Sequence, residues 1–381
     1  MRIQTEIGLL GNTFTGLSGK TKVDFGHGDA QYITFLNVLT HPTIDPTIFE
    51  RVNVKPNEKQ NLCKKGDLFF NTSSETPEEV GMCSCLNVNV PRLYLNSFCF
   101  GFRLKEDASA DSQYLAYFFR GKEGRQIMTM LAQGATRYNL SKENFMRTSI
   151  ELPPKPEQER IAAALTSIDS LIANLERTIQ KKKNIREGAM EELLSGKRRL
   201  PGFSGEWVEK EIGVICHQMR RGSMLKSEDF IAGNIPVIAA GTEPAGYHNV
   251  ANRPPMTISV SSSGANAGYI QFHPYPIFAG DCFTISGSEE YDVQFIYYLL
   301  KNKQKEIFKL QTGGAQPHVH PKDLAPFVIP YTFDIHEQHA IADTLTALDD
   351  EIALLQAECD KYLQIRSGMM DDLLTGKIRL Q

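Results

Sequence analysis

Residues 157–200 read EQERIAAALTSIDSLIANLERTIQKKKNIREGAMEELLSGKRRL, and residues 337–380 read EQHAIADTLTALDDEIALLQAECDKYLQIRSGMMDDLLTGKIRL. The two segments align without a gap at an offset of 180 residues, and 21 of the 44 positions are identical. The chain therefore consists of two half-length units in tandem, each ending in the same segment. An internal repeat of this kind decides how the motifs in front of each copy are interpreted.

Both repeated segments carry apolar residues at alternating steps of three and four, which is the 3.5-residue period of a coiled coil. Prolines at 153, 154 and 156 oppose helix upstream of the first copy, and Gly196 and Gly376 stand where left-handed C-caps are expected. We predict two helices of about 38 residues, each roughly 57 Å long. Their predicted seam consists of Ile161, Leu165, Ile168, Ile172, Leu175, Ile179, Ile341, Leu345, Leu348, Ile352 and Leu355.

Two duplicated helices pack most naturally about a pseudo-twofold axis, which makes them antiparallel. The predicted fold class is therefore α+β: two mixed α/β head domains joined by two long antiparallel coiled-coil helices with internal pseudo-twofold symmetry. The alternative is that each helix packs only on its own head, which the length and regularity of the seam disfavour. The predicted ranges are 1–154 and 201–334 for the heads, and 155–200 and 335–381 for the helices.

The heads differ from each other far more than the helices do. Short apolar stretches at 32–38, 66–72, 234–240 and 256–262 predict strands, and 112–133 and 292–311 predict helices. Gly134 and Gly314, also 180 residues apart, each open a polar stretch before the next long helix. Two domains that share a frame but differ in loop sequence are expected where the loops bind two different ligands.

Composition and charge narrow the class of protein. The 381 residues include no run of 18 apolar residues and no secretion signal, so we expect a cytoplasmic protein without a membrane span. Seven cysteines without a CxxC pair predict reduced thiols rather than a zinc site. Segment 337–381 carries nine acidic and four basic residues, which favours a protein partner there. Cations clustered on one face of a head can still bind DNA despite the net charge of −4, because the local field sets phosphate affinity.

A search for catalytic motifs finds no convincing set. Ser18-Gly19-Lys20-Thr21 resembles the end of a phosphate-binding loop, but Phe14 stands where that motif requires glycine. His318 and His320 form an HxH pair without a third ligand nearby in sequence. Ser261-Ser262-Ser263-Gly264 lacks the flanking glycines of a nucleophile elbow. We therefore expect no catalytic residue, no metal and no cofactor bound by this chain.

The layout resembles the DNA-specificity subunit of type I restriction–modification enzymes. The resemblance covers nearly the whole chain and is carried by the two helix ends, ELLSGKRRLPGFSGEW (192–207) and DLLTGKIRL (372–380), by PPKPEQERIAAAL (153–165) and HEQHAIADTL (336–345), and by GDLFFNTSSETPEEVG (66–81) and IPVIAAGTEPAG (235–246). One departure is PGFSGEW (201–207), which has no counterpart before Glu6.

The resemblance implies a non-enzymatic DNA-binding subunit. Each head would read one half of a bipartite double-stranded DNA site in the major groove, and the helices would hold the heads about 34 Å apart. Adenine methyltransferase subunits would dock on the repeated helices, and restriction subunits with endonuclease and translocase activity would join them. S-adenosylmethionine, ATP and Mg would be bound by those partner subunits, and a methyltransferase would act on a flipped adenine.

Candidate DNA contacts are cations, hydroxyls and amides that lie in polar stretches or directly after an apolar strand. Arg137 and Gln316 are the preferred candidates for reading a base, because both lie in the polar stretches before the long helices. The full predicted set is Lys20, Lys22, Thr72, Ser73, Ser74, Arg137, Tyr138 and Asn139 in the first head, and Arg220, Arg221, Ser261, Ser262, Gln316 and His318 in the second.

A second hypothesis is a non-enzymatic protein scaffold with two peptide-binding heads on a coiled-coil rod. It accounts for the acidic second helix, but less well for heads that diverge while the helices stay alike. Salt dependence separates the two hypotheses, because affinity for DNA falls steeply with salt and affinity for an apolar peptide does not.

Overall fold

The computed structural model describes residues 2–224 and 231–380, which form two compact units. Unit 1 comprises residues 1–174 and 358–381, and unit 2 comprises residues 175–357. Each unit therefore combines one head with the start of one long helix and the end of the other. The second head as predicted, 201–334, includes residues 225–230, which lie outside the described part of the chain.

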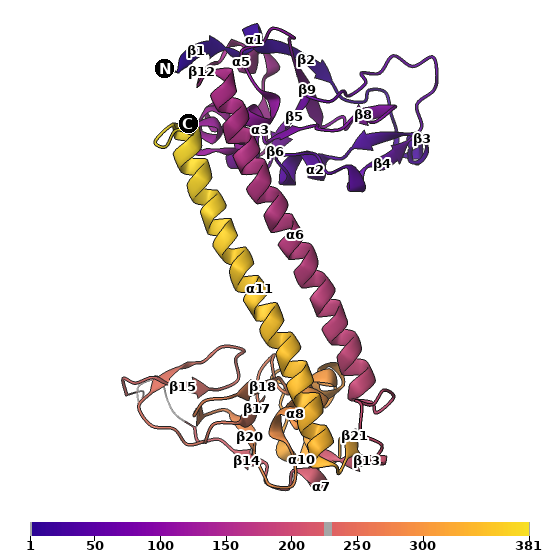
Figure 1. Cartoon of the computed structure of the whole chain (residues 1–381), viewed down its shortest axis with the longest axis vertical. Coiled ribbons are helices and arrows are strands. Elements are labelled where there is room, and N and C mark those ends of the chain that lie inside the picture. The colour runs from indigo at the N-terminus through magenta and orange to yellow at the C-terminus, as the bar shows by residue number, and fades with distance from the viewer. Residues whose placement is uncertain (1, 225–230, 381) are drawn as a thin grey trace. The chain divides into compact units, whose positions relative to one another are not determined.

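The repeated segments form the helices α6 (Lys155–Leu193) and α11 (Ile335–Thr375), which are 39 and 41 residues long (Figure 1). Gly196 and Gly376 follow them with φ of +68° and +76°, so both predicted left-handed caps are confirmed. The Gly196 N–H donates to the Leu193 carbonyl, and the Gly376 N–H donates to the Leu373 carbonyl.

The two helices run antiparallel within each unit. In unit 1, Glu157 near the start of α6 pairs with Arg379 beyond the end of α11, and Asp169 further along α6 pairs with Arg366 further back on α11. The paired residues come later along α6 as they come earlier along α11, so the two helices are antiparallel. Unit 2 repeats this with the pairs Lys182–Glu351, Arg186–Asp349 and Arg199–Glu337.

The start of each predicted seam lies in a head core. Ile161 and Leu165 join the core of the first head, and Ile341 and Leu345 join that of the second. Further along the helices, the seam side chains are buried at Ile168, Ile172 and Ile179 and half-buried at Leu175, Leu348, Ile352 and Leu355. The first turns of each helix therefore pack on that helix's own head. The last turns, at Leu193 and Leu373, join the core of the other head, so the alternative that each helix packs only on its own head is wrong.

Four antiparallel strands form the main sheet of the first head, in the order β2 (Gly11–Thr15), β9 (Cys99–Leu104), β5 (Leu68–Asn71) and β7 (Cys83–Cys85). The helices α3 (Ser112–Arg120) and α4 (Lys122–Leu131) contribute to the same core. Three smaller sheets complete the head: β4 (Glu50–Val52), β3 (Phe25–Ile33) and β8 (Leu93–Leu95); β1 (Ile3–Glu6) and β12 (Ser149–Leu152); and β10 (Ala132–Gln133), β11 (Tyr138–Leu140) and β6 (Ser73–Ser74). The remaining α-helices are α1 (Ile7–Leu10), α2 (Phe35–Thr40) and α5 (Lys142–Arg147).

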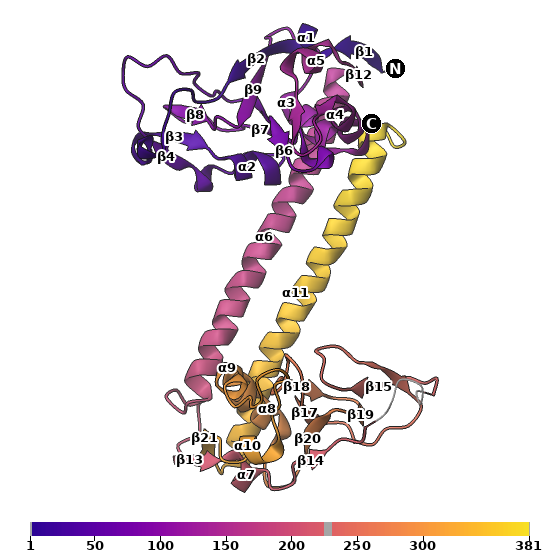
Figure 2. The ribbon, with the colours of Figure 1, turned by 180° about the vertical axis from the view of Figure 1, so that it is seen from behind.

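The second head has the same plan. Its main sheet follows the order β14 (Arg220–Arg221), β20 (Cys282–Ser286), β17 (Thr257–Ser261) and β18 (Ile270–His273), matching β2, β9, β5 and β7 (Figure 2). A sheet of β16 (Gly246–His248), β15 (Ile235–Ile238) and β19 (Phe278–Ala279) matches β4, β3 and β8, and β13 (Trp207–Glu211) with β21 (Val328–Thr332) matches β1 with β12. The helices are α7 (Ile212–Ile215), α8 (Val293–Asn302), α9 (Gln304–Phe308) and α10 (Pro321–Leu324).

Most of the predicted elements of the heads are confirmed, and one is wrong. The strands expected at 66–72, 234–240 and 256–262 are β5, β15 and β17, and each predicted helical stretch forms two helices in succession. The stretch 32–38 is not one strand, because β3 ends at Ile33 and α2 begins at Phe35. The Thr34 side chain accepts a hydrogen bond from the Asn37 N–H, so Thr34 acts as an N-cap and starts a helix in apolar sequence.

Candidate nucleic-acid interface

Two of the predicted contact segments in the first head lie side by side, although more than 60 residues separate them. In the β6–β11 pair, Tyr138 stands opposite Ser74, and Asn139 stands opposite Ser73. The Leu140 N–H extends the ladder by donating to the Thr72 carbonyl at 2.9 Å. The fold therefore brings hydroxyls and amides from both segments to one small sheet.

Arg137 and the β6 residues Ser73 and Ser74 line a recess of about 680 Å³. Ser74 donates a hydrogen bond to Glu79 at 2.8 Å, and the exposed Arg137 lies on the loop directly before β11. Phe35, Glu75 and Glu79 also line the recess and were not singled out from the sequence. An arginine and carboxylates in one recess offer both donors and acceptors, which is the chemistry that distinguishes base edges in the major groove.

The second head brings its predicted residues together in the same way. The backbones of Ser263 and His318 pair in an isolated antiparallel β-bridge, and the Val319 N–H donates to the Ser262 carbonyl at 3.1 Å. Gln316 is exposed on the loop before this bridge. Ser261 is 3% exposed, and its hydroxyl donates to the Ala240 carbonyl, so that side chain serves the structure of the head rather than its surface.

Backbone geometry shifts the equivalence between the two polar loops by one residue. Gly134 has a φ of +137°, and its counterpart with positive φ is Gly313, at +92°, rather than Gly314. A Cβ on Gly134 would lie 2.1 Å from the Arg137 carbonyl oxygen, and one on Gly313 would lie 2.8 Å from that of Gln316. Both glycines are therefore required by a close approach at the same place in the loop.

The corrected equivalence matches the side chains that the sequence favoured. Arg137 corresponds to Gln316, and Asn139 corresponds to His318. The next residue in each loop, Leu140 or Val319, is buried in the core of its head. The two loops thus share a backbone path and an anchor, and they differ in the exposed groups between them.

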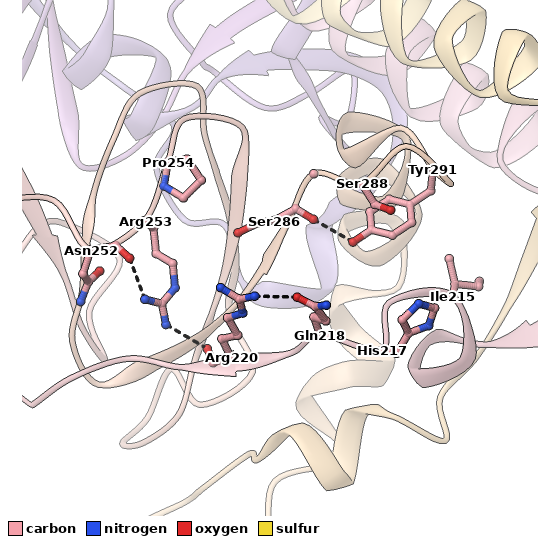
Figure 3. Close-up of a pocket in the computed structure, with 11 residues that line it drawn as sticks. Ile215, His217, Gln218, Arg220, Asn252, Arg253, Pro254, Ser286, Ser288 and Tyr291 are labelled. Carbon is pink, nitrogen blue, oxygen red and sulfur yellow. Dashed lines mark hydrogen bonds between the residues drawn. The ribbon is translucent and has the colours of Figure 1, made fainter.

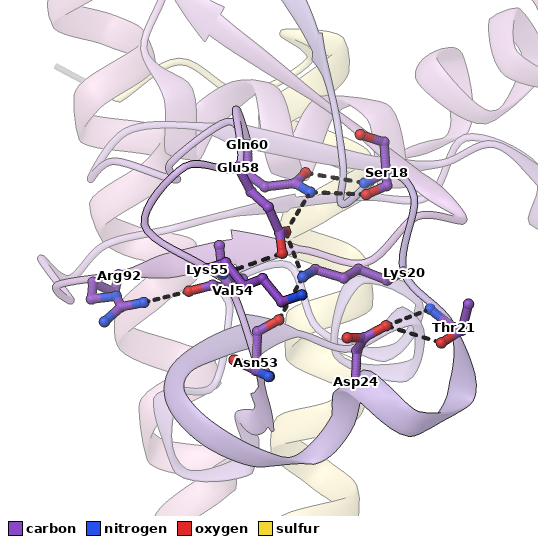
Figure 4. A network of polar contacts seen from close by, with 10 residues as sticks. All are labelled: Ser18, Lys20, Thr21, Asp24, Asn53, Val54, Lys55, Glu58, Gln60 and Arg92. Atoms are coloured by element: carbon purple, nitrogen blue, oxygen red, sulfur yellow. Dashed lines mark hydrogen bonds and ion pairs between the residues drawn. The ribbon is translucent and has the colours of Figure 1, made fainter.

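Lys20 is held inside the first head (Figure 4). Its ammonium lies 2.5 Å from Glu58 and donates to the Asn53 carbonyl at 2.5 Å, and its side chain is only 5% exposed. The hydrogen bond from Lys20 lowers the pKa of Glu58 below its ordinary value. This ion pair leaves Lys20 without an exposed ammonium for phosphate, whereas Lys22 is exposed.

Other predicted DNA contacts, at Thr72, Arg220 and Arg221, belong to segments that are bonded to other parts of their own heads. The Thr72 hydroxyl donates to the Phe98 carbonyl at 2.7 Å, which ties the loop before β9 to the small sheet. Arg220 and Arg221 form β14 at the edge of the main sheet, opposite Thr284 and Phe283, rather than on the loops that carry Ser262 and His318.

Among the described residues, no group of three or more His, Cys, Asp or Glu side chains could hold a metal ion. His318 and His320 stack with ring centroids 5.8 Å apart. All seven cysteines are buried, and desolvation raises the pKa of Cys216 and Cys282 to about 12. None of the helices in the described part of the chain is long and apolar enough to cross a membrane.

A family model of the type I restriction modification DNA specificity domain matches residues 28–184 and 204–361. The chain belongs to that family. The two matches cover most of the sequence and coincide with the two halves of the repeat, so the chain carries two copies of the domain and is a specificity subunit with two target-recognition domains.

Similar proteins agree with this assignment. The specificity subunit of the type I restriction enzyme MjaVIII from Methanocaldococcus jannaschii is 24% identical over 71% of either chain. A candidate specificity subunit of the enzyme MjaX from the same organism is 24% identical over 97% of this chain and 91% of its own. Both relatives are named specificity subunits, in agreement with the expectation that the chain is not an enzyme.

Solved structures share the fold. The crystal structure of a type I restriction–modification S subunit from Mycoplasma genitalium matches with a TM-score of 0.71 and 20% identity, over 98% of this chain and 96% of that one. A chain from a structural study of complex assembly and conformational transition in a type I system matches with a TM-score of 0.50 and 14% identity, over 98% and 97%. The α+β architecture is therefore that of an S subunit.

Proposed function

We propose that each head of this specificity subunit reads one half of a bipartite site in double-stranded DNA through the loop that carries Arg137 or Gln316. The observation that carries the proposal is the shared loop geometry. Both loops have a positive-φ glycine and a buried anchor at equivalent places, yet they expose different side chains. A frame that is kept while its exposed groups change suits two domains that read different bases.

The exposed groups indicate which bases fit best. Arginine pairs in bidentate fashion with guanine O6 and N7, and glutamine pairs similarly with adenine N6 and N7. We therefore assign a guanine to the half-site read by Arg137, and an adenine to the half-site read by Gln316. Glu79 in the first recess is an acceptor for an amino group on a neighbouring base.

The repeated helices are proposed to dock two copies of an adenine methyltransferase subunit. Most of the identities between the helices fall at buried positions, where packing accounts for them. Four exposed positions are also identical, and three of them follow one another at steps of four and three, along one stripe of each helix. The two stripes consist of Lys181, Ile185 and Gly188, and of Lys361, Ile365 and Gly368.

The apolar members of these stripes are exposed in this chain, Ile185 by 46% and Ile365 by 40%. An identical surface placed once in each half suits two identical partners. Restriction subunits would join the same assembly, and S-adenosylmethionine, ATP and Mg would bind to the partner subunits. Reduced cysteines and a DNA target suit the cytoplasm, where we propose that the complex works.

The test is to express the chain with its methyltransferase partner and to sequence adenine methylation in the host genome. The expected result is a new motif of two short half-sites separated by a fixed gap. A complex that forms and binds S-adenosylmethionine but adds no methylation would contradict the proposal and return the scaffold hypothesis to favour.

A further inference from the structure

A polar pocket of about 320 Å³ lies in the second head, beside β14 and the C-terminal end of β20 at Ser286 (Figure 3). Arg220 and Arg253 line it together with amide and hydroxyl side chains. None of the described residues that line the pocket is acidic, although the head as a whole has more acidic than basic residues. The polar lining consists of His217, Gln218, Asn252, Ser286, Ser288 and Tyr291.

Neutral groups hold Arg253 in place at the pocket. Its guanidinium donates to the Thr284 hydroxyl at 2.7 Å, to the Asn252 carbonyl at 2.8 Å and to the Arg221 carbonyl at 2.6 Å. Burial lowers the pKa of Arg253, because desolvation disfavours its charged form. The group therefore carries a partly desolvated positive charge, and its hydrogen-bond partners among the described residues are a hydroxyl and backbone carbonyls, all neutral. Such an arrangement is costly until an anion binds.

Arg220 supplies a second cation to the same pocket. Its guanidinium donates to Gln218 at 2.7 Å, which orients it without neutralising it. Arginine presents several N–H groups in a planar fork that matches the oxygens of a phosphate. Two such groups around one pocket offer the hydrogen-bond donors that a phosphate group requires.

The first head closes the equivalent place with an ion pair. Cys282 stands opposite Ser261 as Cys99 stands opposite Asn71, so Ser286 corresponds to Arg103. In the first head Arg103 pairs with Asp67 at 2.7 Å and lies over the ring of Phe14. In the second head the corresponding pair is the hydroxyls of Thr257 and Ser286, 3.3 Å apart, and the position of Phe14 holds Arg220. An ion pair and an aromatic ring are thus replaced by an open, cationic pocket.

We propose that this pocket binds a phosphate group, supplied by the DNA backbone beside the half-site of the second head. Cys282 begins β20 opposite Ser261, at the end of the sheet next to the loop proposed to read bases. Ser286 lies four residues further along the same strand. That separation is about 13 Å at 3.3 Å per residue, close to the width of the major groove, roughly 12 Å. A phosphate at the groove edge therefore suits a head whose loops reach the bases, and this choice of source rests on the proposed function.

The first experiment measures the affinity of the full chain for duplex DNA over a range of salt concentrations. Arg220→Gln is expected to weaken binding about tenfold for matched and unmatched duplexes alike, and to reduce the slope of log affinity against log salt by about 0.9. Lys309→Gln removes the exposed cation that directly follows α9 in the same head and is expected to change neither quantity. Unchanged affinity and slope in Arg220→Gln would overturn the backbone assignment.

A second arm tests the pocket without DNA, and so stays readable if the proposed function fails. Inorganic phosphate is expected to raise the thermal midpoint of the wild-type chain and not that of Arg220→Gln, because a ligand bound only by the native state stabilises it. Phosphate protection that Arg220→Gln abolishes, together with unchanged DNA affinity, would support a phosphate site while rejecting its DNA source. Equal protection of both proteins, or protection of neither, would overturn the site itself.

A graft provides an independent variant. The double substitution Thr257→Asp with Ser286→Arg rebuilds the ion pair of the first head inside the second. It is expected to fill the pocket and abolish phosphate protection, while the melting profile without phosphate stays cooperative. A cooperative graft that still responds to phosphate as wild type does would contradict the proposed location.

Discussion

Arg186 of α6 donates through Nε to Asp349 Oδ1 of α11 at 2.5 Å, and the Tyr298 hydroxyl of α8 donates to the other oxygen of that carboxylate at 2.8 Å. One carboxylate therefore joins both long helices to the second head. Unit 1 contains the same joint with the copies exchanged: its members are Arg366, Asp169 and Tyr117. Each joint takes its carboxylate from one copy of the repeat and its guanidinium from the other.

Asp349→Ala is expected to destabilise unit 2 by about 1–2 kcal/mol, because the half-buried Arg186 and the Tyr298 hydroxyl both lose their acceptor. Denaturant unfolding followed by a probe in unit 2 measures the change. Lys183→Ala, an exposed substitution on α6, serves as the matched control and is expected to leave the midpoint in place. Equal midpoints for the two variants would show that the joint contributes nothing to stability.

His273 is expected to make the second head sensitive to mild acid. Its Nε2 lies 2.8 Å from the Ser259 hydroxyl, its Nδ1 has no partner among the described residues, and burial lowers its pKa from 6.5 to about 4. Below pH 6.5 the unfolded chain takes up a proton at this residue, and the folded chain does not until about pH 4. The stability that neutral His273 contributes is therefore complete above pH 6.5, and up to about 3 kcal/mol is lost as the pH falls to about 4.

The measurement is the free energy of unfolding between pH 7 and pH 4 for the wild type and for His273→Gln. Glutamine can still hydrogen-bond to Ser259 and does not titrate, so the slope over this window should flatten. His336→Gln changes an exposed histidine and should leave the slope as it is. An unaltered slope in His273→Gln would assign the acid sensitivity to other groups.

Arg137→Ala is expected to relax one position in one half of the methylated motif and to cost about 1–3 kcal/mol in binding of the specific duplex. Gln316→Ala should do the same in the other half only, because the two side chains occupy equivalent places in separate heads. Methylation sequencing of the two single variants distinguishes their halves. The control is Arg147→Ala, which removes an exposed cation paired with Glu143. A motif unaltered by Arg137→Ala would show that Arg137 does not read a base.

Sequence periodicity predicted the long helices and their caps because both depend on local patterns. A 3.5-residue repeat and a glycine just beyond it specify a helix and its end with little help from distant residues. The antiparallel direction followed from symmetry alone. The helix that begins at Phe35 was missed because an apolar run of mixed composition suits a strand or a helix equally, and the Thr34 cap decided between them.

The candidate site was predictable in part. Arg137 and Gln316 were found because polar residues crowd into a short stretch, but their equivalence depended on which glycine takes the left-handed conformation, Gly313 or Gly314. The engagement of Lys20 with Glu58 and the entire pocket around Arg253 depend on contacts between distant segments. Sequence spacing carries no information on such contacts.

Gly188 and Gly368 stand inside the long helices, where glycine costs about 1 kcal/mol relative to alanine. A Cβ built on either residue meets nothing within 4 Å, so the packing of the chain does not require glycine at these places. The proposed docking of a methyltransferase subunit would explain why both copies have glycine, because a docked partner can approach the helix closely there. Alanine at each position is therefore expected to stabilise the free chain by about 1 kcal/mol and, at the same time, to weaken methyltransferase docking.

The opposite signs make this prediction sharp, because a substitution that merely damages the helix would lower both quantities. The measurements are denaturant unfolding of the free chain and titration with the methyltransferase subunit, for each single variant and for the double variant. Each single variant should impair one of two docking sites, and the double variant should impair both. Glu187→Ala is exposed beside Gly188 and differs between the copies, so it should leave docking unchanged. Wild-type docking by the double glycine variant would place the methyltransferase on another face of the helices.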